Sequence, residues 1–101
     1  MINSEIREFL AEWYPDAVLL DNPSFDDSIK GVSSDGNVIY SLDGMAVELA
    51  LEDHISFDEA LEFIDYNTIR NIPYMPDPKP IVMVYSVEDI CVTQSNLNNN
   101  D

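Results

Sequence analysis

Basic residues are what this sequence most conspicuously lacks: four Lys and Arg stand against twenty Asp and Glu, for a formal net charge of −16. Like-charge repulsion on this scale opposes compaction, keeps a protein in solution, and repels nucleic acid and anionic membranes. The composition therefore argues against direct nucleic-acid or membrane binding and favours attraction to basic protein surfaces.

Cysteine, histidine and glycine are also scarce, which removes most catalytic and metal-binding motifs. Cys91 is the only cysteine, so one chain can form neither a disulfide nor a thiolate metal cluster. His54 is the only imidazole, and three glycines leave no Gly-rich phosphate loop. We expect no enzymatic activity, no metal and no cofactor. A small hydrolase using His54 or Cys91 is the alternative.

Long hydrophobic runs are missing as well. No stretch approaches the roughly 20 apolar residues of a membrane span, and the N-terminus MINSEIREF lacks the basic and apolar regions of a signal peptide. We expect a cytoplasmic protein. Its 101 residues, 46% of them hydrophobic, suffice for one core, so we predict a single domain over residues 1–92 and a flexible polar tail over residues 93–101.

Three helices are predicted from hydrophobic spacing and capping residues. The first spans residues 4–14, with one apolar face made of Ile6, Phe9, Leu10, Trp13 and Tyr14. The second begins at Asp43 as N-cap and should turn Val47, Ala50 and Leu51 inward. The third begins at a capping box formed by Ser56 and Glu59 and should end between residues 65 and 71, with Phe57, Ala60, Leu61 and Ile64 inward.

Strands are predicted on both sides of the second and third helices. Residues 28–33 and 37–41 flank Ser34-Asp35-Gly36, and Asp-Gly between two β-prone runs is a strong hairpin signal. Four prolines predict an extended linker over residues 73–80, and the apolar run Ile81 to Tyr85 is typical of a strand buried on both faces. The fold class is therefore α+β, in the order α-β-β-α-α-β, with a small antiparallel sheet of about three strands.

Carboxylates recur at helical spacing on all three predicted helices. Glu5, Glu8, Glu12 and Asp16 form a row on the first helix that should lie opposite the Phe9 and Trp13 face. Shorter rows comprise Glu48 and Glu52 on the second helix, and Asp58, Glu62 and Asp65 on the third. A regular row of carboxylates is able to stand in for the phosphates of a nucleic-acid strand.

The alternative reading of these rows is that they are solvated outer faces, as on any amphipathic helix. Ordinary solvated faces mix both signs of charge and gain from Glu–Lys pairs, whereas residues 42–69 contain no Lys or Arg. We therefore take the nine carboxylates of the three rows as candidate partner-binding residues.

Several segments resemble a group of short uncharacterised proteins of bacteriophages and mobile elements, over about residues 21–85. The most specific of these segments is Ile64-Asp65-Tyr66-Asn67-Thr68-Ile69-Arg70, preceded by Glu62-Phe63 and followed by Pro73-Tyr74. The resemblance implies a phage or prophage origin, and hence a bacterial host cell, but no catalytic residues. Within the segment, Asn67 is expected to close the helix and Arg70 to pair with Asp65 or with an acid of the second helix.

Charge and resemblance together suggest an inhibitor that binds a basic, nucleic-acid-handling protein. By analogy with small acidic phage proteins, the partner would be a host defence nuclease complex, and the protein would be of the anti-CRISPR or anti-restriction type. The second hypothesis is an antitoxin-like or phage assembly protein that neutralises a basic partner, and a stable homodimer would favour it.

Overall fold

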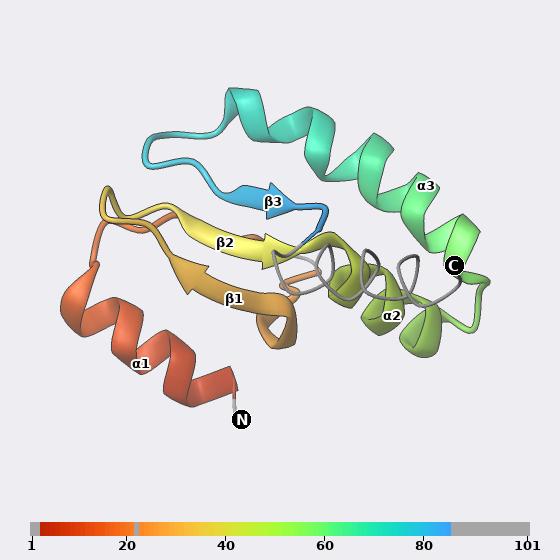
Figure 1. The fold of residues 1–101 in the computed structure, drawn as a ribbon, viewed down its shortest axis with the longest axis horizontal. Helices are drawn as coiled ribbons and strands as arrows, with labels where there is room; N and C mark the ends of the chain where they lie inside the picture. The colour runs from red at the N-terminus through yellow and green to blue at the C-terminus, as the bar shows by residue number, and fades with distance from the viewer. Residues whose placement is uncertain (1–2, 22, 86–101) are drawn as a thin grey trace, which may run out of the picture.

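Three helices and a three-stranded sheet form the part of the chain that the computed structural model describes, residues 3–21 and 23–85 (Figure 1). The elements are α1 (Asn3–Trp13), η1 (Asp26–Ser28), β1 (Ile29–Val32), β2 (Val38–Ser41), α2 (Leu42–Asp53), α3 (Phe57–Asn67), η2 (Ile69–Tyr74) and β3 (Ile81–Met83), where η denotes a 3-10 helix. The predicted α+β class and the order α-β-β-α-α-β are confirmed. The predicted tail, residues 93–101, lies outside the described residues.

The predicted hairpin is formed by β1 and β2, which pair in antiparallel fashion. Its turn is closed by the Ser33 amide, which donates to the Asn37 carbonyl at 2.9 Å, and Gly36 takes a positive φ of 89° that glycine adopts without strain. A bulge between Ile29 and Gly31 shifts the register at the start of β1. The hairpin therefore arises from the Asp-Gly step, as expected.

The sheet is mixed rather than antiparallel, because β3 pairs with β2 in parallel. Parallel neighbours need a long crossover, which α2, α3 and η2 supply between the end of β2 and the start of β3. Pro73 lies inside η2, so the predicted extended linker starts only after Tyr74. These two features correct the sheet type and the linker bounds.

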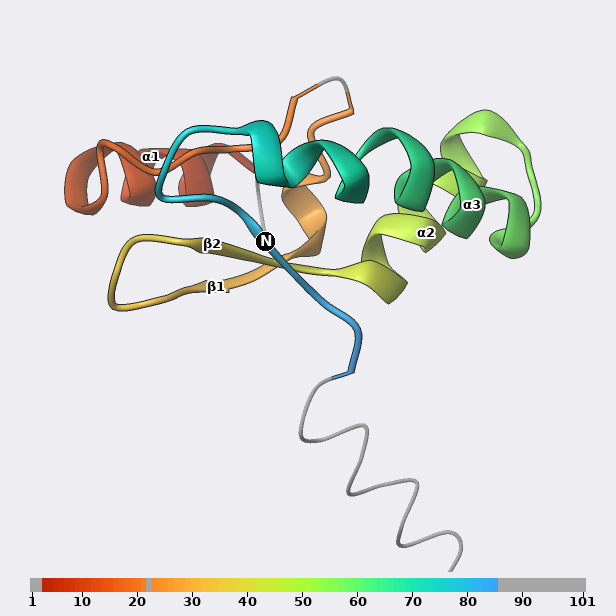
Figure 2. The same ribbon diagram turned by 90° about the horizontal axis from the view of Figure 1, so that it is seen from above.

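One face of the sheet is covered by helices and carries the core. Val38 and Tyr40 of β2 point into it, where they pack with Leu10 of α1 and with the buried residues of the other helices (Met45, Ala46, Leu49, Ala60 and Ile64). Figure 2 shows α1 and α3 on this same side of the sheet. The Tyr40 hydroxyl accepts a hydrogen bond from the Leu20 amide at 2.9 Å, which ties the connector after α1 to the core.

The opposite face carries no helix among the described residues. Ile39 points there because its neighbours Val38 and Tyr40 point to the core, and the register places Ile81 of β3 beside it. Ile81 is 43% exposed, so the prediction that this strand is buried on both faces is wrong.

Helix α2 is rotated relative to the prediction. Met45, Ala46 and Leu49 are buried, whereas Val47 and Leu51 are exposed. The helix is apolar on several sides, so spacing alone does not choose the inner face. Packing chooses it: Gly44 lies so close to η1 that a Cβ there would be 2.9 Å from the Ser28 hydroxyl oxygen. Ser41, rather than Asp43, is the N-cap, and its hydroxyl accepts from the Gly44 amide.

Helix α3 follows the prediction closely. Both hydrogen bonds of the Ser56–Glu59 capping box are present, and the helix ends at Asn67, inside the predicted window. Ala60 and Ile64 are buried and Leu61 is partly buried, whereas Phe57 is 40% exposed, so the predicted inner face is correct except for Phe57.

Candidate functional site

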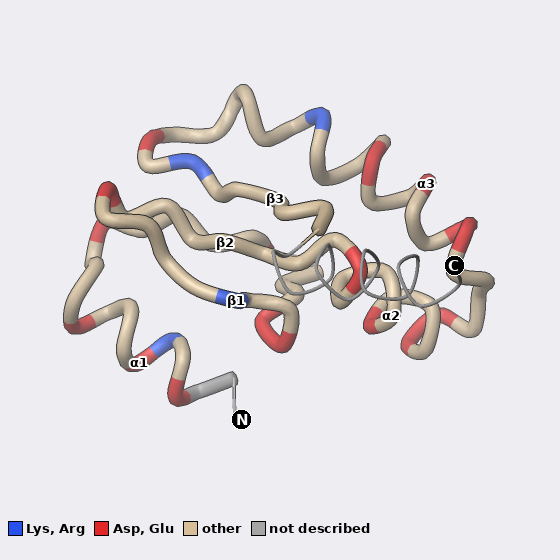
Figure 3. The backbone as a smooth tube through the Cα atoms, viewed as in Figure 1, with Lys and Arg blue, Asp and Glu red and all other residues tan. Residues whose placement is uncertain are grey.

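Exposed carboxylates extend over the whole described molecule. All of its Asp and Glu side chains are exposed except Asp26 and Glu48. Figure 3 shows them on α1, η1, α2 and α3, with the few basic residues scattered between. Three of those basic residues, Arg7, Arg70 and Lys79, pair with carboxylates of the chain itself. The internal ion pairs therefore neutralise little of the acidic surface.

Arg7 of α1 is held by a carboxylate outside its own helix. Its Nε and Nη2 donate to Asp26 at 2.6 and 3.1 Å, and the Asp26 side chain is almost fully buried. The hydrogen bond to Asp26 raises the pKa of Arg7. Because Arg7 compensates Asp26, the carboxylate row on its own helix is left without a counter-charge from α1.

The row on α1 consists of Glu5, Glu8 and Glu12, all exposed, while Asp16 is exposed in the turn beyond the helix. The row is not opposite Phe9 and Trp13 as predicted. At 100° per residue, Phe9 lies only about 40° around the helix from Glu5. Phe9 and Trp13 are 50% and 65% exposed, with ring centroids 6.5 Å apart. An acidic stripe and an aromatic pair therefore border each other on α1.

Glu48 does not belong to an exposed row. It is partly buried at the contact between α2 and η1 and accepts a hydrogen bond from the Ser28 hydroxyl. Burial raises the pKa of Glu48, with smaller contributions from Asp27, Asp26 and Glu52, and the Ser28 hydrogen bond partly opposes them. Glu52 is exposed, so only one member of the predicted pair on α2 faces solvent, while Glu48 packs against η1.

The row on α3 keeps two unpaired members. Asp58 and Glu62 are exposed, whereas Asp65 is exposed but paired with Arg70 at 3.4 Å. The Arg70 guanidinium also lies 5.0 Å from the centre of the Tyr66 ring. The expected pairing of Arg70 with Asp65 is confirmed.

The string Ile64 to Arg70 closes α3 with bonds inside the chain. The Asn67 side chain donates to the Phe63 carbonyl at 3.1 Å, and the Asn71 side chain donates to the Asn67 carbonyl at 2.7 Å. Ile64 and Thr68 are buried. The side-chain amides of Asn67 and Asn71 therefore help to close α3, as expected for Asn67.

The acidic rows do not form one continuous surface. Figures 1 and 2 show α1 and α3 in opposite halves of the long axis of the molecule. The principal extents are 49 × 31 × 27 Å, so a partner has to span most of the length to contact both rows. Sequence spacing placed the carboxylates on helices but carried no information on how those helices are arranged.

His54 is exposed at the C-cap of α2, where it adopts a left-handed φ of 57°. Cys91 lies outside the described residues. In residues 3–21 and 23–85, no three His, Cys, Asp or Glu side chains gather as metal ligands would. Over the same residues, no helix has the length and apolar character needed to cross a membrane.

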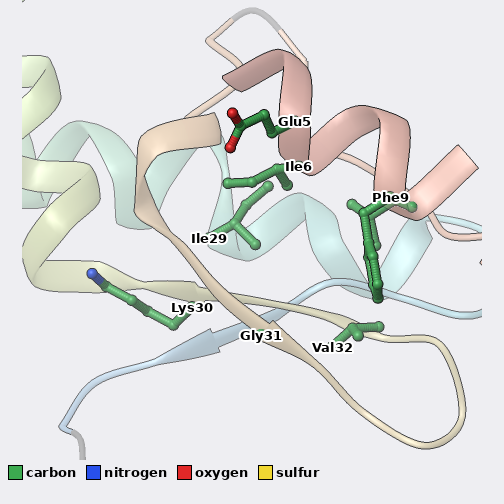
Figure 4. A pocket seen from close by; sticks show the side chains of 8 residues that line it. Glu5, Ile6, Phe9, Ile29, Lys30, Gly31 and Val32 are labelled. Atoms are coloured by element: carbon green, nitrogen blue, oxygen red, sulfur yellow. The ribbon is translucent and has the colours of Figure 1, made fainter. Parts of the chain in front are cut away.

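A groove of about 380 Å³ runs between α1 and β1 (Figure 4), and no prediction from sequence pointed to it. Ile6 and Phe9 reach down from α1 toward Ile29 and Val32 of β1, Glu5 stands at its rim, and Lys30 points away from the helix. The usable sequence signal was Gly31, because a glycine inside a strand often marks a bulge or a close approach of another backbone. The groove joins the acidic row to an apolar lining.

Comparison with known proteins adds no assignment to this geometry: no protein family, no curated protein and no solved structure matches this chain.

Proposed function

We propose that this protein is a non-enzymatic inhibitor that binds a basic, nucleic-acid-handling protein and competes with that protein's nucleic acid. The observation that carries the proposal is the exposed, largely uncompensated carboxylate surface, above all on α1 and from α2 through α3. A phage-encoded inhibitor of a host defence nuclease, of the anti-CRISPR or anti-restriction type, is the form that the sequence resemblance favours.

Charge explains how such an inhibitor finds its partner. A net charge of −16 produces a field that accelerates encounter with a basic channel, and exposed apolar side chains then slow dissociation. Phe9 and Trp13 lie beside the carboxylates of α1 and supply such contacts. Long-range attraction and short-range apolar contact are therefore available on one helix.

The separation of α1 from α3 restricts the mode of binding. A partner groove that follows one nucleic-acid strand would meet either the row of α1 or the acidic end formed by α2 and α3. The row on α1 is the better candidate, because its three carboxylates are exposed and Arg7 is occupied by Asp26. The nine predicted binding residues thus reduce to a primary set of Glu5, Glu8 and Glu12.

A pull-down from bacterial lysate at low salt, eluted with a salt gradient, identifies the partner. Two triple variants with the same charge change then locate the contact: Glu5→Gln, Glu8→Gln, Glu12→Gln on α1, and Asp58→Asn, Glu62→Gln, Asp65→Asn on α3. The α1 variant should associate more slowly with the captured partner, and the α3 variant should be affected less. Capture that persists at high salt, or partners without a basic surface, would contradict the proposal.

An antitoxin-like or assembly protein is the second candidate, favoured by the face of the sheet that no helix of residues 3–21 and 23–85 covers. Ile81 is 43% exposed there beside Ile39, and such apolar surface is typical of subunit contacts. Sedimentation equilibrium separates the two candidates: a stable dimer that Ile81→Ser dissociates supports this second candidate, and a monomer supports the inhibitor.

A further inference from the structure

In the part of the chain that the structure describes, the outer edge of β1 is open, and the residues of β1 line the groove. The strand order is β1-β2-β3, so among the described residues β1 has a neighbour on one side only. At the turn the Ser33 amide donates to the Asn37 carbonyl, whereas the Asn37 amide donates to the Ser33 hydroxyl. The neighbouring ladder pair, Val32 with Val38, therefore occupies a non-hydrogen-bonded position. The N–H and C=O of Val32 therefore point away from β2, where a further strand would bind.

The groove beside that edge has the shape and the apolar lining that suit an extended peptide segment. It is bounded by a helix on one side and by an edge strand on the other, with Ile6, Phe9 and Ile29 as apolar lining. An added strand places alternate side chains on opposite faces, so every second residue would enter the groove beneath α1. The space beside Gly31 is open, because a Cβ built on this residue meets no other atom within 4 Å.

Charge decides what kind of segment fits. Glu5 stands on the groove rim, and Glu8 and Glu12 continue the acidic stripe along the same helix. A second copy of the chain would bring another net charge of −16 to this rim, which is unfavourable, whereas a basic segment is attracted.

We infer that the groove between α1 and β1 binds an extended segment of the partner in which basic residues alternate with apolar ones, by adding it as a strand to the outer edge of β1. This inference rests on the proposed function and specifies it further. The apolar residues enter the groove against Ile6 and Phe9, and the basic residues meet the carboxylates of α1.

The test uses a labelled nine-residue peptide in which lysine alternates with valine, measured by fluorescence anisotropy at low salt. Two analogues carry backbone N-methyl groups, one on every valine and the other on every lysine. Each modification removes the hydrogen-bond donors along one edge of the extended peptide while leaving all side chains and charges unchanged. If the peptide adds to β1, one analogue loses about tenfold or more in affinity and the other retains binding.

Two matched pairs of protein variants place the peptide. Phe9→Ala should weaken binding about tenfold, because Phe9 lines the groove, and Phe57→Ala, the same change at an exposed position of α3, should have little effect, because Phe57 does not line the groove. Glu5→Gln should weaken binding more than Glu62→Gln, which removes the same charge from α3. Circular dichroism checks that each variant folds, and the N-methyl comparison needs only the unaltered protein.

The possible failures are distinguishable. Equal binding of both N-methyl analogues and of the unmodified peptide would overturn strand addition while leaving a charge-driven basic partner intact. No binding of any of these peptides at low salt would overturn both proposals. A homodimer in sedimentation that Phe9→Ala dissociates would replace the partner segment with a second copy and overturn the inference.

Discussion

Asp26 and Glu48 are the two described carboxylates that the fold withdraws from water, and they are stabilised in different ways. Asp26 receives two charge-assisted hydrogen bonds from Arg7, which offset the cost of its burial. Glu48 has only the Ser28 hydroxyl and lies near other acids, so its charged form is disfavoured in the folded state. One buried carboxylate is therefore compensated by a cation, and the other carries a cost at neutral pH.

Asp26→Asn should lower the free energy of unfolding by about 1.5–3 kcal/mol, since it removes charged hydrogen bonds from a buried site. Asp27→Asn, which removes the same charge from the exposed neighbour, should change the free energy of unfolding by less than about 0.5 kcal/mol. Urea unfolding of both variants measures the difference. Equal losses would mean that the ion pair with Arg7 contributes nothing specific.

Glu48→Gln should stabilise the protein near pH 7 more than Glu52→Gln, which removes an exposed charge from the same helix. A raised pKa in the folded state favours the protonated form, so the contribution of Glu48 to stability is present below its ordinary pKa. That contribution is lost as the pH rises through the raised pKa. The excess stabilisation should therefore disappear in acid, as urea unfolding at pH 4 and pH 7 would show; an excess independent of pH would contradict the assignment.

At the scale of elements, the sequence predicted what local chemistry determines. The Asp35-Gly36 turn gave the hairpin and the Ser56–Glu59 box gave the start of α3, because each signal is complete within a few residues. The inner face of α2, the parallel pairing of β3 and the groove at β1 were missed. Each depends on contacts between segments far apart in the chain, such as Gly44 against Ser28.

A pair of leucine variants tests the observed rotation of α2. Leu49 is 4% exposed and Leu51 is 73% exposed, although the sequence pattern had placed Leu51 inward. Leu49→Ala should lower the free energy of unfolding by about 2–5 kcal/mol, and Leu51→Ala by less than about 0.5 kcal/mol. Thermal and urea unfolding give both values. A larger loss of stability for Leu51→Ala than for Leu49→Ala would contradict the observed orientation and support the one predicted from the sequence.

At the scale of the whole molecule, the excess of negative charge lowers the stability of the folded state, so its presence calls for a functional explanation. A net charge of −16 on 101 residues repels itself in the compact state, and three of the four basic residues are engaged in local pairs. The exposed carboxylates are spread over several helices and do not gather on one face of the molecule. The binding that we propose therefore combines long-range attraction by the whole negative charge with a specific contact on α1.

Salt should stabilise the isolated protein, because it screens this repulsion. The Debye length falls from about 30 Å at 0.01 M salt to about 3 Å at 1 M. The melting temperature should therefore rise steadily with sodium chloride at neutral pH, and the triple variants on α1 and α3 should respond less than the unaltered chain. A melting temperature that is flat or falls with salt would show that self-repulsion is unimportant.

Competition with nucleic acid tests the central claim most directly. The partner captured from lysate is mixed with labelled DNA or RNA that it binds, and the protein is titrated in at low and at physiological salt. We predict displacement of the nucleic acid that weakens as salt rises and that is impaired more by the α1 triple variant than by the α3 triple variant. A ternary complex in which the nucleic acid stays bound at a large excess of the protein would contradict the account.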